Sequence, residues 1–364
     1  MSGTMVVFPP MLPIPKTAAA LSENVHRGRL LEGVDLSGLN FSRAKAAGAT
    51  LNEVDLHGAD LRGIDLREAQ LAGCNLQGAR LDGANLTRAA LVECNLTAAS
   101  LTGAKLTATK LAKCPGERLD LTGADLRATA WVECELSSVR LSEARLDRTM
   151  FVQCRLDHAD LRDTTLSTVT LMEVDLRTVS LRGAALDKVI LIGSNLAGMD
   201  LSRMRLRQVQ WTGANLEGTS LSGADLEGGN FSNANLRGAT LDRAHAPRCL
   251  FADADLEAAS LTGAELTQCV FAGAKLGKAR LGGATLTESV LTGADLHEVS
   301  AVRADLRYAD LSQSDLRAAD LRGANLFRTN LHAIIDTQAN IPDREKALGT
   351  DPELLAAQRW TPQY

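Results

Sequence analysis

A five-residue period runs through most of this chain and constrains its fold more than any other feature. Stepping by five from position 31 to position 331 samples 61 sites, and 57 of them hold Leu, Phe or Trp. The exceptions are Ala46, Gly116, Ala246 and Ala301. No insertion or deletion breaks the register, so the pattern cannot be a product of chance. A fixed internal period indicates a solenoid, in which each repeat packs only on its neighbours.

Each repeat has a second regular position, two residues before its centre, where a small or slim side chain stands. Ala59 and Cys74 are examples, and Asp or Asn often lies between the two positions, as in the unit ADLRG that ends at Gly63. This unit resembles the repeat of the pentapeptide-repeat family, and the resemblance covers about residues 31–335. It implies an all-β fold, a right-handed quadrilateral parallel β-helix with four pentapeptides per coil. The central and the small preceding residues would then point inward.

Two kinds of side chain recur at every fourth repeat, which independently supports a coil with four sides. Of the seven aromatic centres, all except Phe41 share one remainder modulo 20, so a coil of four pentapeptides stacks their rings on one face. Five cysteines follow one such column, and Cys249 and Cys269 form a second. The predicted core ladder is Trp131, Phe151, Trp211, Phe231, Phe251 and Phe271, together with Cys74, Cys94, Cys114, Cys134 and Cys154.

The repeat divides the chain into three predicted parts. Residues 1–30 are a proline-rich N-terminal arm and cap, residues 31–335 a β-helix of about 15 coils, and residues 336–364 a C-terminal helical cap and tail. Inside the solenoid, proline occurs only as Pro115 and Pro247, each beside a defective centre. Because proline removes a ladder donor, each predicts a local kink or bulge, either a tolerated irregularity or a recognition feature.

A short helix is predicted near the C-terminus. Asp351 supplies an N-cap, Pro352 suits the first helical position and Glu353 the first turn. We expect the segment to carry Leu354, Leu355 and Trp360 over the open last coil, because an exposed β edge invites aggregation. In some family members a C-terminal extension forms a dimer contact, so the resemblance leaves dimerisation open.

The sequence predicts no enzyme, cofactor or metal site. Its six histidines do not gather in one column, and no phosphate-binding glycine loop or nucleophile with a positioned base is visible. Stacked thiols could bind soft metals or oxidise, but buried Cys usually behaves as a small hydrophobe. The five-cysteine column is therefore interpreted as structural filler. A small-molecule substrate is not expected.

Composition narrows the class of partner and the compartment. Aromatic residues make up 3% of the chain and hydrophobic residues 45%, which suits a thin core of Leu and Ala. A net charge of −5 offers no basic footprint for direct nucleic-acid binding. No apolar run is long enough to predict a membrane helix, and the N-terminus lacks the features of a signal peptide. An odd number of cysteines without a disulfide framework favours a cytoplasmic protein.

One side of the coil stands out by its outward residues. We call it the aromatic-cored face, the side whose centres are Leu31, Leu51 and every twentieth residue onward. Its outward charges sum to −5, as on the next side, whereas the other two sides sum to +2 and +3. Its outward neighbours are unusually apolar and form one continuous exposed stripe, which predicts an interaction surface, although strand propensity alone would also favour such residues. The candidate interface residues are Val92, Val132, Met150, Val152, Met172, Ile190, Ile192, Leu250 and Val270.

These features predict a non-enzymatic scaffold that binds a protein partner or forms a homodimer through this face. The family resemblance offers an alternative, a DNA mimic that binds type II topoisomerase and inhibits gyrase or protects it from quinolones. That role rests on a strongly acidic surface, which a net charge of −5 supplies only weakly. The C-terminal sequence, including Trp360 to Pro362, is similar to bacterial pentapeptide proteins associated with type VI secretion. This similarity would make the chain an accessory of an effector or spike.

Overall fold

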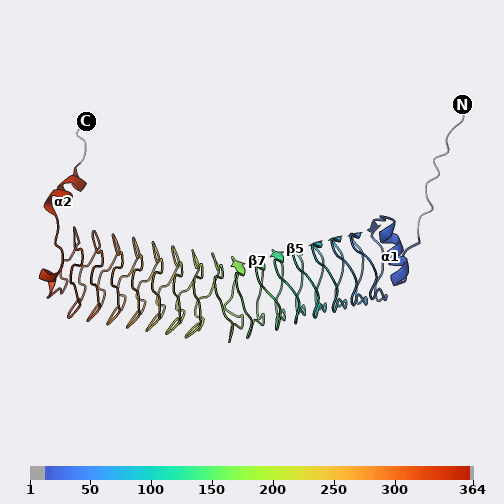
Figure 1. Cartoon of the computed structure of the whole chain (residues 1–364), viewed down its shortest axis with the longest axis horizontal. Helices are drawn as coiled ribbons and strands as arrows, with labels where there is room; N and C mark the ends of the chain where they lie inside the picture. The colour runs from blue at the N-terminus through green and yellow to red at the C-terminus, as the bar shows by residue number, and fades with distance from the viewer. Residues whose placement is uncertain (1–12, 361–364) are drawn as a thin grey trace, which may run out of the picture. The chain divides into compact units, whose positions relative to one another are not determined.

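The computed structural model describes residues 13–360, which form two compact units. Unit 1 comprises residues 13–145 with His158–Asp160, and unit 2 comprises Leu146–Asp157 with residues 161–360. Within each unit the chain winds in stacked, parallel coils, which Figure 1 shows as repeated loops. Residues 1–12 of the predicted N-terminal arm, with Pro9 and Pro10, lie outside the described residues.

Unit 1 begins with helix α1, Ala18–His26, capped by Thr17, whose Oγ1 accepts a hydrogen bond from the Ala20 amide at 3.2 Å. The helix buries Leu21 and ties Ser22 Oγ to the Lys45 amide at 2.8 Å, against the first coils. Six short strands follow on the aromatic-cored face: β1 Leu31–Glu32, β2 Thr50–Asn52, β3 Gln70–Ala72, β4 Ala90–Val92, β5 Lys110–Ala112 and β6 Ala130–Val132.

The strand register confirms the four-sided coil. From β1 to β6, successive strands pair in parallel with a step of four repeats, as in Leu31 opposite Leu51 and Leu111 opposite Trp131. The other sides pair through single bridges with the same step, for example Asp60 with Arg80. Four pentapeptides therefore make one turn of the predicted parallel β-helix.

Unit 2 continues the same construction. Strands β7, Met150–Val152, and β8, Thr170–Met172, pair with Phe151 opposite Leu171. Later coils are joined by single bridges with the same four-repeat step, such as Ile190 with Gln210. The solenoid is followed by a 3₁₀ helix, η1 Arg344–Lys346, and helix α2, Pro352–Arg359.

Helix α2 confirms the predicted C-terminal helix but not the predicted contacts of its apolar side chains. Asp351 caps it by accepting hydrogen bonds from the amides of Glu353 at 2.9 Å and Leu354 at 3.0 Å. Leu354 is 48% exposed and Trp360 71% exposed, so the expectation that both bury the last coil was wrong. The physical reason is that backbone already covers that edge: the Leu331 amide donates to Leu348 O at 2.9 Å.

The core is a set of inward columns. The repeat centres and the residues two positions before them are buried along nearly the whole solenoid. In unit 2 the rings of Trp211, Phe231, Phe251 and Phe271 stack nearly parallel, with successive centroids 5.6, 4.8 and 4.7 Å apart. Trp131 in unit 1 and Phe151 in unit 2 are also fully buried.

The backbone ladder passes through both prolines. Pro115 O accepts from the Leu96 amide at 2.6 Å, and Pro247 O accepts from the Gly228 amide at 3.0 Å. The adjoining defective centres also stay paired, since the Gly116 amide donates to Glu135 O at 2.7 Å. The kink or bulge predicted at these sites therefore does not interrupt the ladder.

Candidate functional site

The predicted interface residues all lie on the outward side of the aromatic-cored face, but they form separate patches. Val92 and Val132 belong to unit 1, and Val92 is 44% exposed. In unit 2 a first patch spans the coils of β7, β8 and the following turn, where Met150 is 42% and Ile192 37% exposed. Half-buried Val152, Met172 and Ile190 fill the space between them.

Two polar coils divide the apolar surface of unit 2. Asn230 Nδ2 donates to Gln210 Oε1 at 3.2 Å where the stripe would otherwise continue. A second patch follows, in which Leu250, 41% exposed, is paired with Val270, and Val270 with Val290. The sequence prediction of one continuous stripe is therefore replaced, in unit 2, by two patches about three coils long.

Unit 1 adds a shallow groove on the same face, which the sequence analysis missed. It has a volume of about 320 Å³ and includes Leu30, which is 48% exposed. Leu30 precedes the first complete repeat, so the periodic pattern did not draw attention to it. The groove is lined by Leu30, Thr50, Leu51, Asn52, Gln70, Leu71, Ala72, Ala90 and Val92.

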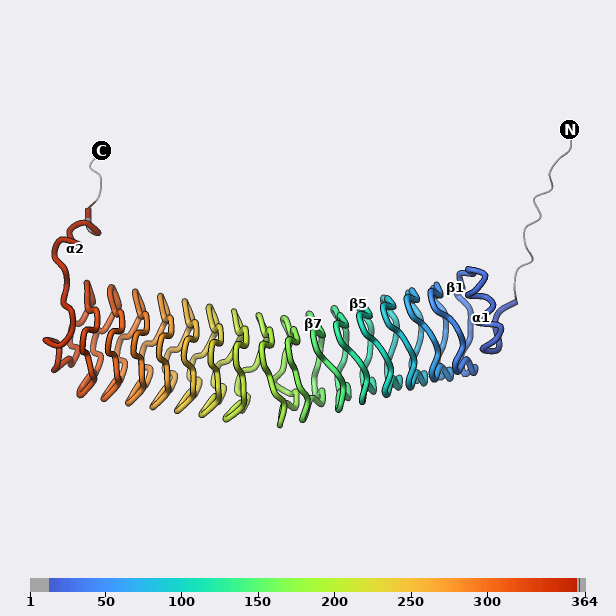
Figure 2. Tube along the Cα trace, in the orientation of Figure 1, coloured from blue at the N-terminus to red at the C-terminus, as the bar shows by residue number. Residues whose placement is uncertain are grey.

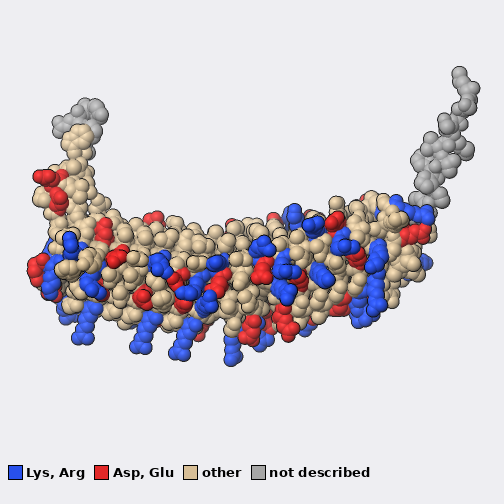
Figure 3. Space-filling view, in the orientation of Figure 1, with Lys and Arg blue, Asp and Glu red and all other residues tan. Residues whose placement is uncertain are grey.

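The other sides of the coil are covered by charged side chains that neutralise one another. In a recurring arrangement, an arginine two residues after an aspartate folds back on its carboxylate, as Arg67 does on Asp65 through two bonds of 2.8 Å. The Arg317 guanidinium likewise holds the pKa of Asp315 below its usual value by hydrogen bonding. Figure 3 shows Lys, Arg, Asp and Glu over the facing side of each unit and fewer along the upper edge, where the strands lie.

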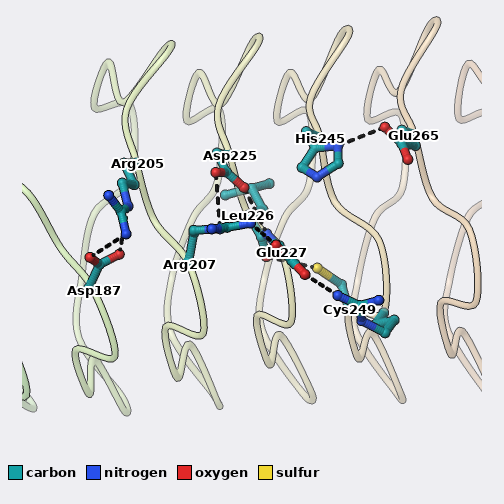
Figure 4. Close-up of polar contacts among 10 residues, drawn as sticks. Asp187, Arg205, Arg207, Asp225, Leu226, Glu227, His245, Cys249 and Glu265 are labelled. Carbon is teal, nitrogen blue, oxygen red and sulfur yellow. Dashed lines mark hydrogen bonds and ion pairs between the residues drawn. The ribbon is translucent and has the colours of Figure 1, made fainter.

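A charged network crosses several coils of unit 2 (Figure 4). Arg207 contacts Asp225 at 3.2 Å and also binds Glu227, which Arg248 contacts from the next coil. His245 Nδ1 lies 2.7 Å from Glu265 Oε2. Beside the network is a groove of about 560 Å³ lined by Ser167, Thr168, Asp187, Lys188, Arg205, Arg207, Gln208 and Glu227.

This network places potential metal ligands of Asp225, Glu227 and His245 within 4.8 Å of one another. This cluster is not apparent from the histidine columns of the sequence, because its three residues come from neighbouring rows of adjacent coils. Both carboxylates already bind guanidinium groups, which compete with a cation for the same oxygens. We therefore describe the cluster as an ion-pair network and assign no metal to it.

The seven cysteines are all buried and form no disulfide. The Cys94 thiol lies 3.5 Å from Leu71 O, one coil away, so each sulfur can use a backbone carbonyl as its acceptor. The pKa of the Cys114 thiol is raised to about 12 by its hydrogen-bonding interaction with Cys134 and by burial. Such thiols are protonated at neutral pH and are poor nucleophiles and metal ligands.

Comparison with known proteins identifies the repeat. A family model described as "Pentapeptide repeats (8 copies)" matches residues 30–63, 64–103, 120–157, 134–171, 170–208, 200–238, 212–245, 249–288, 264–300 and 294–332, which is well over half of the chain. No curated protein sequence matches. Between residues 13 and 360, no helix has the length and apolar character needed to cross a membrane.

Solved structures similar to this chain include pentapeptide repeat proteins. QnrB1, described as a plasmid-mediated fluoroquinolone resistance protein, is 16% identical over 56% of this chain and 81% of its own, with a TM-score of 0.29. A pentapeptide repeat protein from the thylakoid lumen of Arabidopsis thaliana is 30% identical over 32% of this chain and 68% of its own, with a TM-score of 0.25. HetL from Nostoc sp. strain PCC 7120 is 24% identical over 83% of this chain and 86% of its own, with a TM-score of 0.18.

Proposed function

This chain belongs to the pentapeptide-repeat family, and we propose that it is a non-enzymatic scaffold that binds a protein surface through the apolar patches of its aromatic-cored face. The bound surface is that of a protein partner or of a second copy of the chain. The patch formed by Met150, Val152, Met172, Ile190 and Ile192 is the main contact of unit 2.

The observation that supports this proposal is the exposure of large apolar side chains on a regular strand ladder. Met150 and Ile192 expose 42% and 37% of their surface on nearby coils of one face. Contiguous exposed apolar area of this kind usually marks a site where proteins meet. At the equivalent outward positions of other faces the chain places paired charges, such as Asp65 with Arg67. Among the coils, the large exposed apolar side chains therefore lie mostly on this face, with Tyr308 and Phe327 as a pair on another.

A photo-crosslinking experiment tests the proposal. A photoreactive amino acid placed at Ile192 should form a crosslinked product, either with a second copy in purified protein or with one partner in cells. The same amino acid at Val302, an outward and half-buried residue of another face, is the matched control and should give none. Changing Met150, Val152 and Ile190 to Ser should abolish the Ile192 product, because the mutated patch no longer gains by burial.

Light scattering over a range of concentrations separates the two kinds of partner. A second copy as partner predicts a molecular mass that rises with concentration and falls back in the serine variant. If the partner is a different protein, the unmodified chain and the serine variant should both be monomers, and the crosslinked band should form only in cells. If Ile192 forms no product in either setting, or forms the same products as Val302, the interface is not on this face.

The alternative of a topoisomerase-binding DNA mimic is supported by no specific observation. Such a mimic needs rows of free carboxylates, but here arginines neutralise many of them, as Arg322 does for Asp320. A gyrase supercoiling assay with added protein distinguishes the two functions, since the scaffold proposal predicts neither inhibition nor protection from a quinolone. A role as a type VI secretion accessory would specify the scaffold's partner, and co-purification with a secreted effector or spike tests it.

A further inference from the structure

On the side of the coil opposite the aromatic-cored face, the backbone ladder of unit 2 opens between two successive coils. On the coils before and after, the ladder is complete: the Leu161 amide donates to Ser180 O at 3.0 Å and the Leu201 amide to Ser220 O at 2.8 Å. Within the described residues, the equivalent amides of Leu181 and Gly183 donate to no carbonyl. We call this opening the seam, and it lies between residues 179–185 and 199–205.

The second wall of the seam also has unpaired backbone groups. By the pattern of the following coil, where the Ser220 amide donates to Met199 O at 2.9 Å, the Asp200 amide should donate to Val179 O. That bond and the one expected from the Arg205 amide do not form in the part of the chain that the structure describes. Pairing resumes beyond the corner, where the Lys188 amide donates to Arg207 O at 3.0 Å.

Two methionines explain why the ladder opens here. Met199 and Met204 occupy the position two residues before a centre, where the coils on either side carry Val179 and Ala184, then Thr219 and Ala224. A methionine is too long for the corner that holds alanine or threonine, and overpacking displaces the backbone. Both methionines are accordingly half-buried.

The opening is a hollow of molecular size. It has a volume of about 590 Å³ and is lined by Arg177, Val179, Ser180, Leu181, Arg182, Gly183, Gly198, Met199, Asp200, Ser202 and Met204. In Figure 2 the coils near residue 190 are drawn apart along their lower edge, whereas those that follow are evenly spaced. A volume of several hundred Å³ is typical of a ligand site.

The chemistry of the hollow fits one class of ligand. Its walls present the unpaired N–H and C=O groups of parallel strand edges, which extended peptide backbone satisfies by adding a strand. Its floor includes two thioethers, which adapt to varied apolar side chains. Two arginines line its rim: Arg182 forms no ion pair among the described residues, whereas Arg177 binds Asp175.

We propose that the seam binds an extended, acidic peptide segment of another protein by strand addition. The peptide backbone pairs with Leu181, Gly183 and Asp200, one apolar side chain lies against Met199 and Met204, and acidic side chains face the arginines of the rim. This site lies on the face opposite the proposed apolar interface, so one scaffold would hold two different partners at once.

The state of the seam is tested by amide hydrogen exchange on the full chain. The amides of Leu181 and Gly183 should exchange rapidly, whereas those of Leu161 and Leu201 should be protected. Changing Met199 and Met204 to Ala should close the ladder and protect Leu181. Val209→Ala, the same kind of substitution at the equivalent position of an intact face, should leave Leu181 exchanging rapidly. Protection of Leu181 in the unmodified chain would overturn the proposal.

Peptide binding is tested by fluorescence anisotropy with an eight-residue labelled peptide of alternating valine and glutamate. It should bind the unmodified chain and the Val209→Ala variant equally, and at least about tenfold more weakly after the double methionine change. N-methylation of alternate backbone amides should weaken binding by at least about tenfold, because it removes the ladder donors of the peptide. Arg182→Gln should weaken binding and reduce its salt dependence.

Three outcomes would contradict the proposal. Equal binding of the N-methylated peptide would show that charge alone holds it. Equal binding of a peptide with lysine in place of glutamate would exclude recognition by the arginines. Binding that survives closure of the seam, as measured by exchange at Leu181, would place the peptide elsewhere. None of these results depends on the apolar patch around Ile192, so this proposal and the proposed function fail separately.

Discussion

Replacing Phe251 with Leu takes one ring from the middle of a stack of four. The ring centroid of Phe251 lies 4.8 Å from that of Phe231 and 4.7 Å from that of Phe271. Leu is the residue at most other centres, so the new side chain suits the column and leaves the coil register unchanged. Each aromatic contact is worth about 0.5–1.5 kcal/mol beyond burial of area, and two are lost, so the free energy of unfolding should fall by about 1–3 kcal/mol.

A double-mutant cycle in urea, followed by far-UV circular dichroism, isolates the stacking contribution. Leu substitutions at Phe231 and Phe251 should couple by about 0.5–1.5 kcal/mol, because these rings touch. Substitutions at Phe231 and Phe271 should add independently, since those rings lie two coils apart. Phe41→Leu, in a column with Leu61 as its next member, controls for loss of ring area. Equal coupling for the near and the distant pair would refute the stacking argument.

Three further predictions concern single side chains. Because hydrogen bonding from Arg317 lowers the folded pKa of Asp315, the pair stabilises the fold above the unfolded pKa and stops doing so as pH falls through the folded value. In urea titrations at several pH values, Arg317→Gln should therefore cost a little stability at pH 7, and this cost should shrink as pH falls below the unfolded pKa of about 3.9. The Cys114 thiol, with a pKa of about 12, should resist iodoacetamide at pH 8 in the native chain and react in urea, and rapid native labelling read by mass spectrometry would contradict its burial. Trp211 Nε1 is buried with no hydrogen-bond partner in the described residues, and such a donor costs about 1–3 kcal/mol. Trp211→Phe removes this donor together with part of the indole packing, so it should change stability by less than about 1 kcal/mol. A thermal melt that shows a larger loss would mean that indole packing outweighs the cost of the unpaired donor.

The coil could be predicted from the sequence because its geometry is periodic. The slim residues two positions before the centres of the pentapeptides indicate which side chains point inward. The cysteines from Cys74 to Cys134 recur at every fourth repeat and so indicate one column. The strand pairs of unit 1 follow that step. Local signals were equally readable at Asp351, where cap, proline and acid coincide in the order that starts a helix.

The seam could not be read from the same pattern. Met199 is hydrophobic and stands at an inward position, so periodicity alone assigns it to the core. Only its volume relative to Val179 and Thr219 in the same column reveals the conflict. The proximity of Asp225 and His245 was also hidden, because these residues belong to adjacent coils. The polar residues Gln210 and Asn230 divide the apolar surface, and a list of apolar residues alone does not show this division.

The ring column of unit 2 has a consequence for how the chain finds its native pairing. Because the coils are built from nearly identical repeats, the chain can misfold by leaving out one coil, so that a coil packs on the next but one. Such a misfolded arrangement keeps most Leu-on-Leu contacts, so uniform columns penalise it little. Trp211, Phe231, Phe251 and Phe271 occupy consecutive coils, and a skip there loops out one ring and places the others against the wrong partners. The ring contacts that a skip removes therefore favour the native order of coils over the skipped one.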